Sequence, residues 1–91
     1  MRKFVILVNA PSTQQQNALS KFLQGTPCGY WHYLSDAWLV VDSRPASTAA
    51  SWRDEIQTLL PGKNILVFSV TVEDWAGNMP KKNFEWLQKS W

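Results

Sequence analysis

Apolar and polar residues alternate along the 91-residue chain in strand-like and helix-like stretches. Residues 4–8 form an unbroken apolar run rich in β-branched side chains, with a proline shortly after it, which predicts a strand that ends there. Because the run contains no polar residue, we expect both faces of this strand to be covered. A helix is predicted over about residues 13–24, since Ser12 and Gln15 match a capping box and Gly25 follows the apolar stripe.

An aromatic-rich hairpin is predicted next. Its halves are residues 30–34 and 37–41, separated by Ser35-Asp36. This pair lacks the glycine that two-residue hairpin turns prefer, so the pattern leaves the register open by a residue or two.

The second half of the chain repeats the helix–strand pattern. Ser47 or Thr48 can cap a helix whose apolar stripe runs to residue 60, where a Pro-Gly pair ends it. Residues 64–72 read as a final strand with two apolar faces, and about residues 80–90 read as a terminal helix.

The predicted order is therefore β-α-β-β-α-β with a helical tail, which is typical of a ferredoxin-like split βαβ α+β sandwich. We expect one domain over residues 1–91, with a core at about 3–72 and a tail helix at about 80–90. In such a fold the first strand lies mid-sheet and both helices cover one face. The terminal helix or a second copy of the chain must cover the other, so we expect a homodimer.

Composition narrows the classes of protein. The mass of 10.4 kDa, with 45% hydrophobic residues and six tryptophans, indicates one globular domain. A net charge of +2 attracts nucleic acid or anionic lipid only weakly. The lone Cys28 excludes an internal disulfide and a cysteine-cluster zinc site. The short apolar run near the start matches neither a signal peptide nor a membrane span, so a bacterial-type cytoplasmic protein is the expectation.

The hairpin aromatics are candidate ligand or interface residues. Strand alternation places Tyr30, His32 and Leu34 on one face and Trp31 and Tyr33 on the other. His32 is the only histidine and has no partners spaced for a metal site, so it is either an acid–base group or a member of an aromatic cross-strand pair.

Tryptophans on a sheet can stack on bases, but no Lys or Arg lies between residues 30 and 42. Trp31, Trp38 and Trp52 are therefore expected as core or dimer-interface anchors, and nucleic acid has little support as a partner. Lys81 and Lys82 are the candidate phosphate contacts, with the solvated side of the terminal helix as the alternative.

The hairpin at residues 29–40 resembles that of small SinR-like proteins, relatives of the compact CRISPR-adaptation subunit family and of VapD-like ribonucleases. Further similarity lies in residues 48–60 and 64–72, in Asp74-Trp75-Ala76-Gly77 and in Phe84-Glu85-Trp86-Leu87. The resemblance implies a ferredoxin-like homodimer.

In nuclease-active relatives the first strand ends in Tyr-Asp, and the two aspartates of a dimer hold a divalent cation. The matching residues here are Val8-Asn9, and an uncharged amide binds such a cation weakly. Asn9 and Ser12 thus form a candidate polar site at the dimer axis, with turn chemistry for Asn9 and helix capping for Ser12 as the alternatives.

We therefore expect a non-catalytic binding or assembly module, with no assigned catalytic residue, no metal site and no cofactor beyond a weakly held cation at Asn9. One alternative is a metal-dependent endoribonuclease or DNase at the dimer axis. Another is a small-ligand binder of the dimeric α/β-barrel type, with a pocket between sheet and helices lined by Trp31, His32 and Tyr33.

Overall fold

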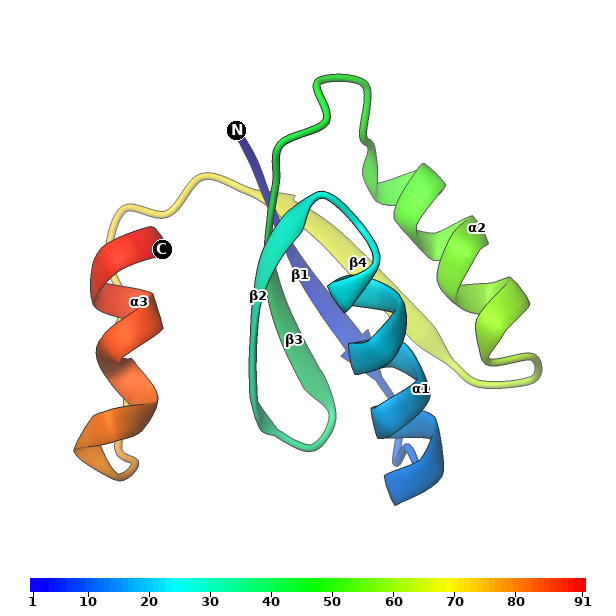
Figure 1. The fold of residues 1–91 in the computed structure, drawn as a ribbon, viewed down its shortest axis with the longest axis horizontal. Helices are drawn as coiled ribbons and strands as arrows, with labels where there is room; N and C mark the ends of the chain where they lie inside the picture. Colours follow the sequence, from blue (N-terminus) through cyan, green and yellow to red (C-terminus); the bar gives the residue numbers. More distant parts are fainter.

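The computed structural model describes all residues from Met1 to Trp91. Four strands and three α-helices follow one another with one short 3₁₀ turn (Figure 1). In chain order they are β1 (Arg2–Val8), α1 (Thr13–Gln24), β2 (Cys28–Leu34), β3 (Ala37–Asp42), α2 (Ala49–Leu59), β4 (Ile65–Val70), η1 (Lys81–Phe84) and α3 (Glu85–Ser90). None of the helices combines the length and the apolar character needed to cross a lipid bilayer.

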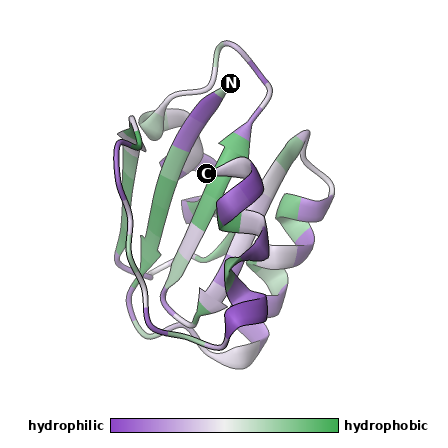
Figure 2. Ribbon diagram, turned by 90° about the vertical axis from the view of Figure 1, so that its left-hand side faces the viewer, coloured by the Kyte–Doolittle hydropathy of each residue, from purple (hydrophilic) through white to green (hydrophobic).

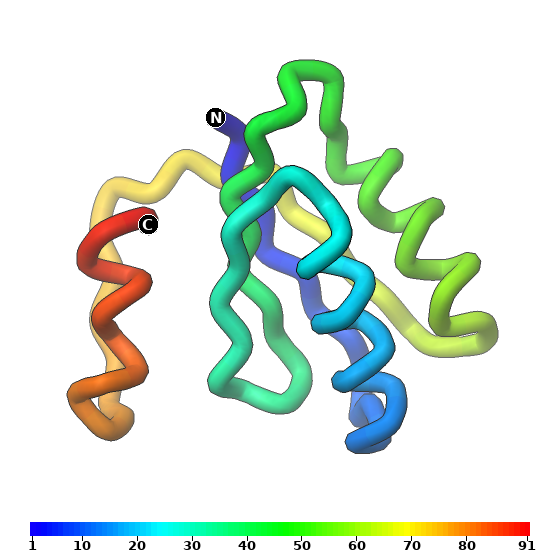
Figure 3. Tube along the Cα trace, in the orientation of Figure 1, coloured from blue at the N-terminus to red at the C-terminus, as the bar shows by residue number.

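The strands form one antiparallel sheet in the order β2-β3-β1-β4. The predicted apolar first strand therefore lies inside the sheet, between β3 and β4. α1 and α2 pack on one face, and the segment after β4 crosses to the other face, where α3 lies (Figures 1 and 3). This α+β arrangement is compatible with the expected ferredoxin-like sandwich.

The main core lies between the sheet and the two longer helices. Every second residue of β1 points into it, because successive strand side chains alternate between faces. Trp38 and Trp52 are both fully buried there, which confirms their prediction as core residues. The cluster comprises Phe4, Ile6, Val8, Leu19, Leu23, Trp38, Val40, Trp52, Ile56 and Leu60.

Helix capping follows the sequence closely. Ser12 accepts a hydrogen bond from the main-chain N–H of Gln15, whose side chain accepts one from the N–H of Ser12, so α1 begins where predicted. Thr48 is the cap of α2, and it shares the same reciprocal arrangement with Ser51. Ser47, the other capping candidate, is buried and bonds elsewhere.

The second face of the sheet is only partly covered. The tail, which is residues 71–91 with η1 and α3, lies over the β2–β3 side of the sheet. There Trp31 is 4% exposed and donates from Nε1 to the main-chain oxygen of Asn83 at 2.7 Å. On β4, Leu66 and Phe68 remain 53% and 47% exposed. Figure 2, which looks onto this face, shows hydrophobic stretches of the strands that the tail leaves in view. The expectation that both faces of β1 are covered thus holds in full only on the helix side.

The hairpin departs from strict alternation. The β2–β3 register shifts between Trp31 and Leu34, and Leu34 pairs with Ala37 across the two-residue turn. The shift is an irregularity of the β-bulge kind, and it moves Leu34 to the tail side with Trp31. The predicted grouping of Leu34 with Tyr30 and His32 is therefore wrong, because alternation does not survive a register shift.

Candidate functional site

A polar corner lies where β1 ends, between the turn that precedes β3 and the start of β4. It opens into a pocket of about 390 Å³. Three side chains at this corner carry hydrogen-bonding groups, namely Asn9, Asp36 and Asn64. The apolar remainder of the lining is Leu7, Val8, Ile65 and Leu66. We call this site the polar corner.

Main-chain hydrogen bonds bring the three polar residues together. The N–H of Val8 donates to the Asp36 main-chain oxygen at 2.8 Å, and the N–H of Asn9 donates to the Asn64 main-chain oxygen at 3.0 Å. The Asp36 carboxylate also accepts from the N–H of Ala10 at 3.4 Å and from the Ser35 hydroxyl at 2.9 Å. Asn9 is therefore held between two segments that are distant in the sequence.

The backbone beside Asn9 is strained. Ala10 has a φ of 43°, the one non-glycine residue of the chain with positive φ, and such a conformation costs about 1–3 kcal/mol. Lys63 Nζ donates to the main-chain oxygen of Ala10 at 2.9 Å and lies 3.4 Å from that of Asn9. The corner thus combines a lysine and a carboxylate with two amides.

The polar corner offers both hydrogen-bond donors and acceptors. Its lining holds a single carboxylate, that of Asp36. Nowhere in the chain do three or more His, Cys, Asp or Glu side chains gather in a way that would hold a metal ion. Ser12, predicted together with Asn9, lies one turn away as the helix cap and does not line this pocket.

Asp36, Lys63 and Asn64 were not singled out as site residues from the sequence. Each looks like an ordinary turn or loop residue locally, and only the two strand pairings of β1 place them beside Asn9. One signal in the sequence could have found them. Asp36 lies in the turn before β3 and Asn64 in the loop before β4, and a first strand that lies mid-sheet has both of these strands as neighbours.

An apolar strip adjoins the polar corner on the face away from α1 and α2. Val5 lies directly opposite Phe68 in the β1–β4 ladder, and Leu7 lies opposite Leu66. We call these four residues the open strip. Its β4 members are about half exposed, while Val5 and Leu7 are partly buried. Leu7 and Leu66 also line the polar corner, so the two features are continuous.

The structure does not bring Trp31, His32 and Tyr33 together in one pocket. The His32 ring stacks on Trp38 on the helix side, with centroids 3.8 Å apart and planes at 2°. Its Nδ1 lies 2.9 Å from the main-chain oxygen of Ala37, and its Nε2 lies 3.1 Å from Gln16 Oε1. The cross-strand aromatic pair is thus confirmed. Trp31 faces the tail, and Tyr33 is 56% exposed.

A buried carboxylate, Asp42, links the end of β3 to α2. Its side chain accepts hydrogen bonds from Arg44, Ser47 and Trp52 Nε1. Burial acts to raise the pKa of Asp42, but the hydrogen bonds from Arg44 and Ser47 outweigh it and hold that pKa below its usual range. All of its acceptor capacity is used by the protein itself, so we assign Asp42 to stability.

Cys28 is a protected thiol. It is partly buried, and Sγ lies 3.6 Å from the main-chain oxygen of Leu23. Burial, reinforced by the negative charge of Asp42, raises the pKa of Cys28 to about 11. The thiol therefore stays protonated near neutral pH and is a poor nucleophile.

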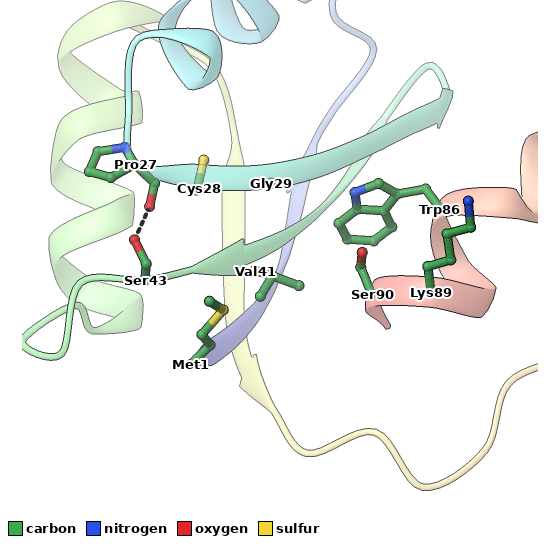
Figure 4. A pocket seen from close by; sticks show the side chains of 9 residues that line it. All are labelled: Met1, Pro27, Cys28, Gly29, Val41, Ser43, Trp86, Lys89 and Ser90. Carbon is green, nitrogen blue, oxygen red and sulfur yellow. Dashed lines mark hydrogen bonds between the residues drawn. The ribbon is translucent and has the colours of Figure 1, made fainter.

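A pocket of about 510 Å³ lies between α3 and the ends of β2 and β3. Figure 4 shows the Cys28 sulfur pointing away from Met1 and Val41, which lie on the other side of the strand. Lys89 is the one Lys or Arg side chain in this lining. The phosphate candidates Lys81 and Lys82 are exposed in η1 and do not line it.

Comparisons of the chain with protein-family models, with curated proteins and with solved structures return no match.

Proposed function

We propose that this chain is a ferredoxin-like domain that acts as a homodimeric, non-catalytic assembly or binding module, pairing through the open strip. The single observation that carries the proposal is the half-exposed pair of large apolar side chains on β4, Leu66 and Phe68. They stand directly opposite Leu7 and Val5, so the exposed apolar surface is continuous across two strands. Contiguous apolar surface of this kind marks interaction sites.

The amount of surface supports pairing. The chain exposes 5797 Å², whereas a compact monomer of this mass exposes about 5400 Å². A standard interface takes ~800 Å² from each partner, or about one-seventh of this surface. Apolar area removed from water contributes about 25 cal/mol per Å². Burial of the open strip between two copies of the chain would therefore stabilise a dimer.

The polar corner would make the pairing specific. A two-fold interface places the same patch of both subunits face to face. If the two open strips pack on each other, the polar corner of each subunit lies at the edge of the interface. Asn9 and Asn64 offer amides that can donate and accept, which makes them self-complementary. Asp36 and Lys63 supply opposite charges for the same contact.

Size-exclusion chromatography with light scattering at micromolar concentration tests the proposal. We expect about twice the chain mass of 10.4 kDa for the unmodified protein. The double variant Leu66→Ser/Phe68→Ser should be monomeric with an unchanged far-UV circular dichroism spectrum. Tyr33→Ser is the matched control, because Tyr33 is 56% exposed on the opposite edge strand. An unmodified protein that stays monomeric would overturn the proposal.

One observation keeps the metal-dependent endoribonuclease or DNase as a second candidate, namely that the Asp36 carboxylate lines the same pocket as Asn9. Such an enzyme would cleave RNA or DNA in the presence of Mg²⁺ or Mn²⁺. If the polar corner is the active site, Asn9→Ala and Asp36→Asn must each abolish the cleavage. Asp54 is an exposed carboxylate on α2, so Asp54→Asn must leave the cleavage intact.

A further inference from the structure

A third cavity, separate from the polar corner, lies between the tail and the β2–β3 half of the sheet. Its volume is about 300 Å³. The sheet forms its floor, and the segment after β4 together with η1 and α3 forms its walls. Twelve residues line it, among them Trp31, Ala37, Trp75, Ala76, Gly77 and Phe84. We call it the tail pocket.

Aromatic side chains in fixed positions shape the tail pocket. Trp31 is nearly buried and is held by its hydrogen bond to Asn83. Trp75 lies against Phe84, with ring centroids 5.7 Å apart, yet keeps 38% of its surface exposed. The Phe84 ring also packs against Gly77, where a Cβ would lie 2.9 Å from Phe84 Cε1. The pocket is thus built by packing and leaves an aromatic edge open to solvent.

The electrostatic character of the tail pocket is neutral. None of its twelve lining residues has a charged side chain, and ten of them are hydrophobic. The main-chain N–H groups of residues 71–79 make no hydrogen bond within the protein. Close to the wall, the buried Oδ1 of Asn83 also lacks a partner. Apolar walls with a few polar groups are typical of small-molecule sites.

We propose that the tail pocket binds a small, neutral, planar ring compound of about bicyclic size, such as indole. Volume supports this class, because apolar cavities of ~150 Å³ take up benzene and the tail pocket has about twice that space. Flat ring compounds stack favourably on tryptophan and phenylalanine faces. The absence of charged side chains in the lining disfavours anions and cations, which would lose their hydration without compensation.

Indole titrated into ¹⁵N-labelled protein and followed by NMR tests this proposal. We expect saturable shifts of residues 75–87 and of the Trp31 indole N–H, with a Kd below about 1 mM. Ala37→Phe should fill the pocket and weaken binding at least tenfold. Ala46→Phe is the matched control, because Ala46 is exposed in the loop before α2. Ala76→Trp should also fill the pocket and weaken indole binding. It lies in the exposed loop, so it changes no residue of the sheet.

The outcomes separate the competing occupants. Absence of saturable indole binding, or binding that Ala37→Phe and Ala76→Trp leave unchanged, would overturn the proposal. Equal affinity for indole and for the anion indole-3-acetate would overturn the neutral-ligand assignment. A change of oligomeric state in Ala76→Trp would instead show that a second copy occupies the pocket. The Leu66→Ser/Phe68→Ser variant should bind indole normally, so this inference and the dimer proposal fail independently.

Discussion

Replacing Asp42 by asparagine tests how the end of β3 is held to α2. Asp42 is fully buried, and each of its two oxygens accepts several hydrogen bonds. Oδ1 accepts from the main-chain N–H of Arg44 at 2.9 Å and from its Nε at 3.1 Å. Oδ2 accepts from Arg44 Nη2 at 3.0 Å, from Trp52 Nε1 at 3.0 Å and from the Ser47 hydroxyl.

The magnitude follows from counting these donors. An asparagine keeps one oxygen and replaces the other by NH₂, so in either orientation at least two donors face another donor. Each buried group left without a partner costs about 1–3 kcal/mol. The Arg44 side chain is 34% exposed and can recover part of this loss from water. We expect Asp42→Asn to lower the free energy of unfolding by about 2–4 kcal/mol at pH 7.

The cost should depend on pH. Because the pKa of Asp42 in the folded protein lies below its usual value, ionised Asp42 stabilises the fold at every pH above the unfolded value of about 3.9. That contribution is lost as the pH falls through the folded pKa. The difference between the wild type and Asp42→Asn should therefore be constant above about pH 5 and shrink below about pH 4.

Urea unfolding followed by tryptophan fluorescence, at pH 7 and in steps down to pH 3, measures both effects. Asp54→Asn is the control, since Asp54 pairs with Arg53 at the surface, where both side chains are more than half exposed. It should change the free energy of unfolding by less than about 0.5 kcal/mol. A loss below about 1 kcal/mol for Asp42→Asn, or one that does not vary with pH, would refute the account of Asp42 as a charged link.

Three further substitutions or reactions probe other features. Ala10→Gly should stabilise the protein by about 0.5–1 kcal/mol in urea unfolding because it relieves the positive φ, whereas Ala18→Gly within α1 should destabilise it by about 1 kcal/mol. Gly77→Ala should cost about 1–3 kcal/mol by forcing Phe84 aside, and an unchanged melting temperature would contradict that contact. With its pKa raised from 9.0 to about 11, Cys28 should react with iodoacetamide at pH 8 about 100-fold more slowly than in the urea-unfolded chain, as followed by mass spectrometry.

Local patterns in the sequence were sufficient for the elements and for the class of fold. An apolar run predicts a strand, and a hydroxyl residue with a partner three residues later predicts a helix start, because both rest on interactions between near neighbours. The start of α1 after Ser12 illustrates this. The burial of Trp38 and Trp52 was predictable in the same way, since Trp38 lies in an apolar strand pattern and Trp52 lies in the apolar stripe of α2.

Other features were decided only when distant segments met. The register shift after Trp31 depends on how β2 fits against β3. The Ser35-Asp36 turn indicates only that the register is open, and no local pattern places the shift. The polar corner requires two separate strand pairings of β1. The donors of Asp42 come from Arg44, Ser47 and Trp52, which meet at one buried carboxylate only when α2 packs on the sheet.

The second face of the sheet shows the division most clearly. Its apolar residues could be predicted from alternation, because strand side chains alternate whatever lies above them. Which of these residues the tail covers could not be predicted. The path of residues 71–80 has no repeating hydrogen-bond pattern, and it depends on how Trp75, Phe84 and Trp91 pack against the sheet. Sequence alone thus determined that an apolar face exists, and the tertiary structure decided that β2 and β3 lie under the tail while the β4 side stays open.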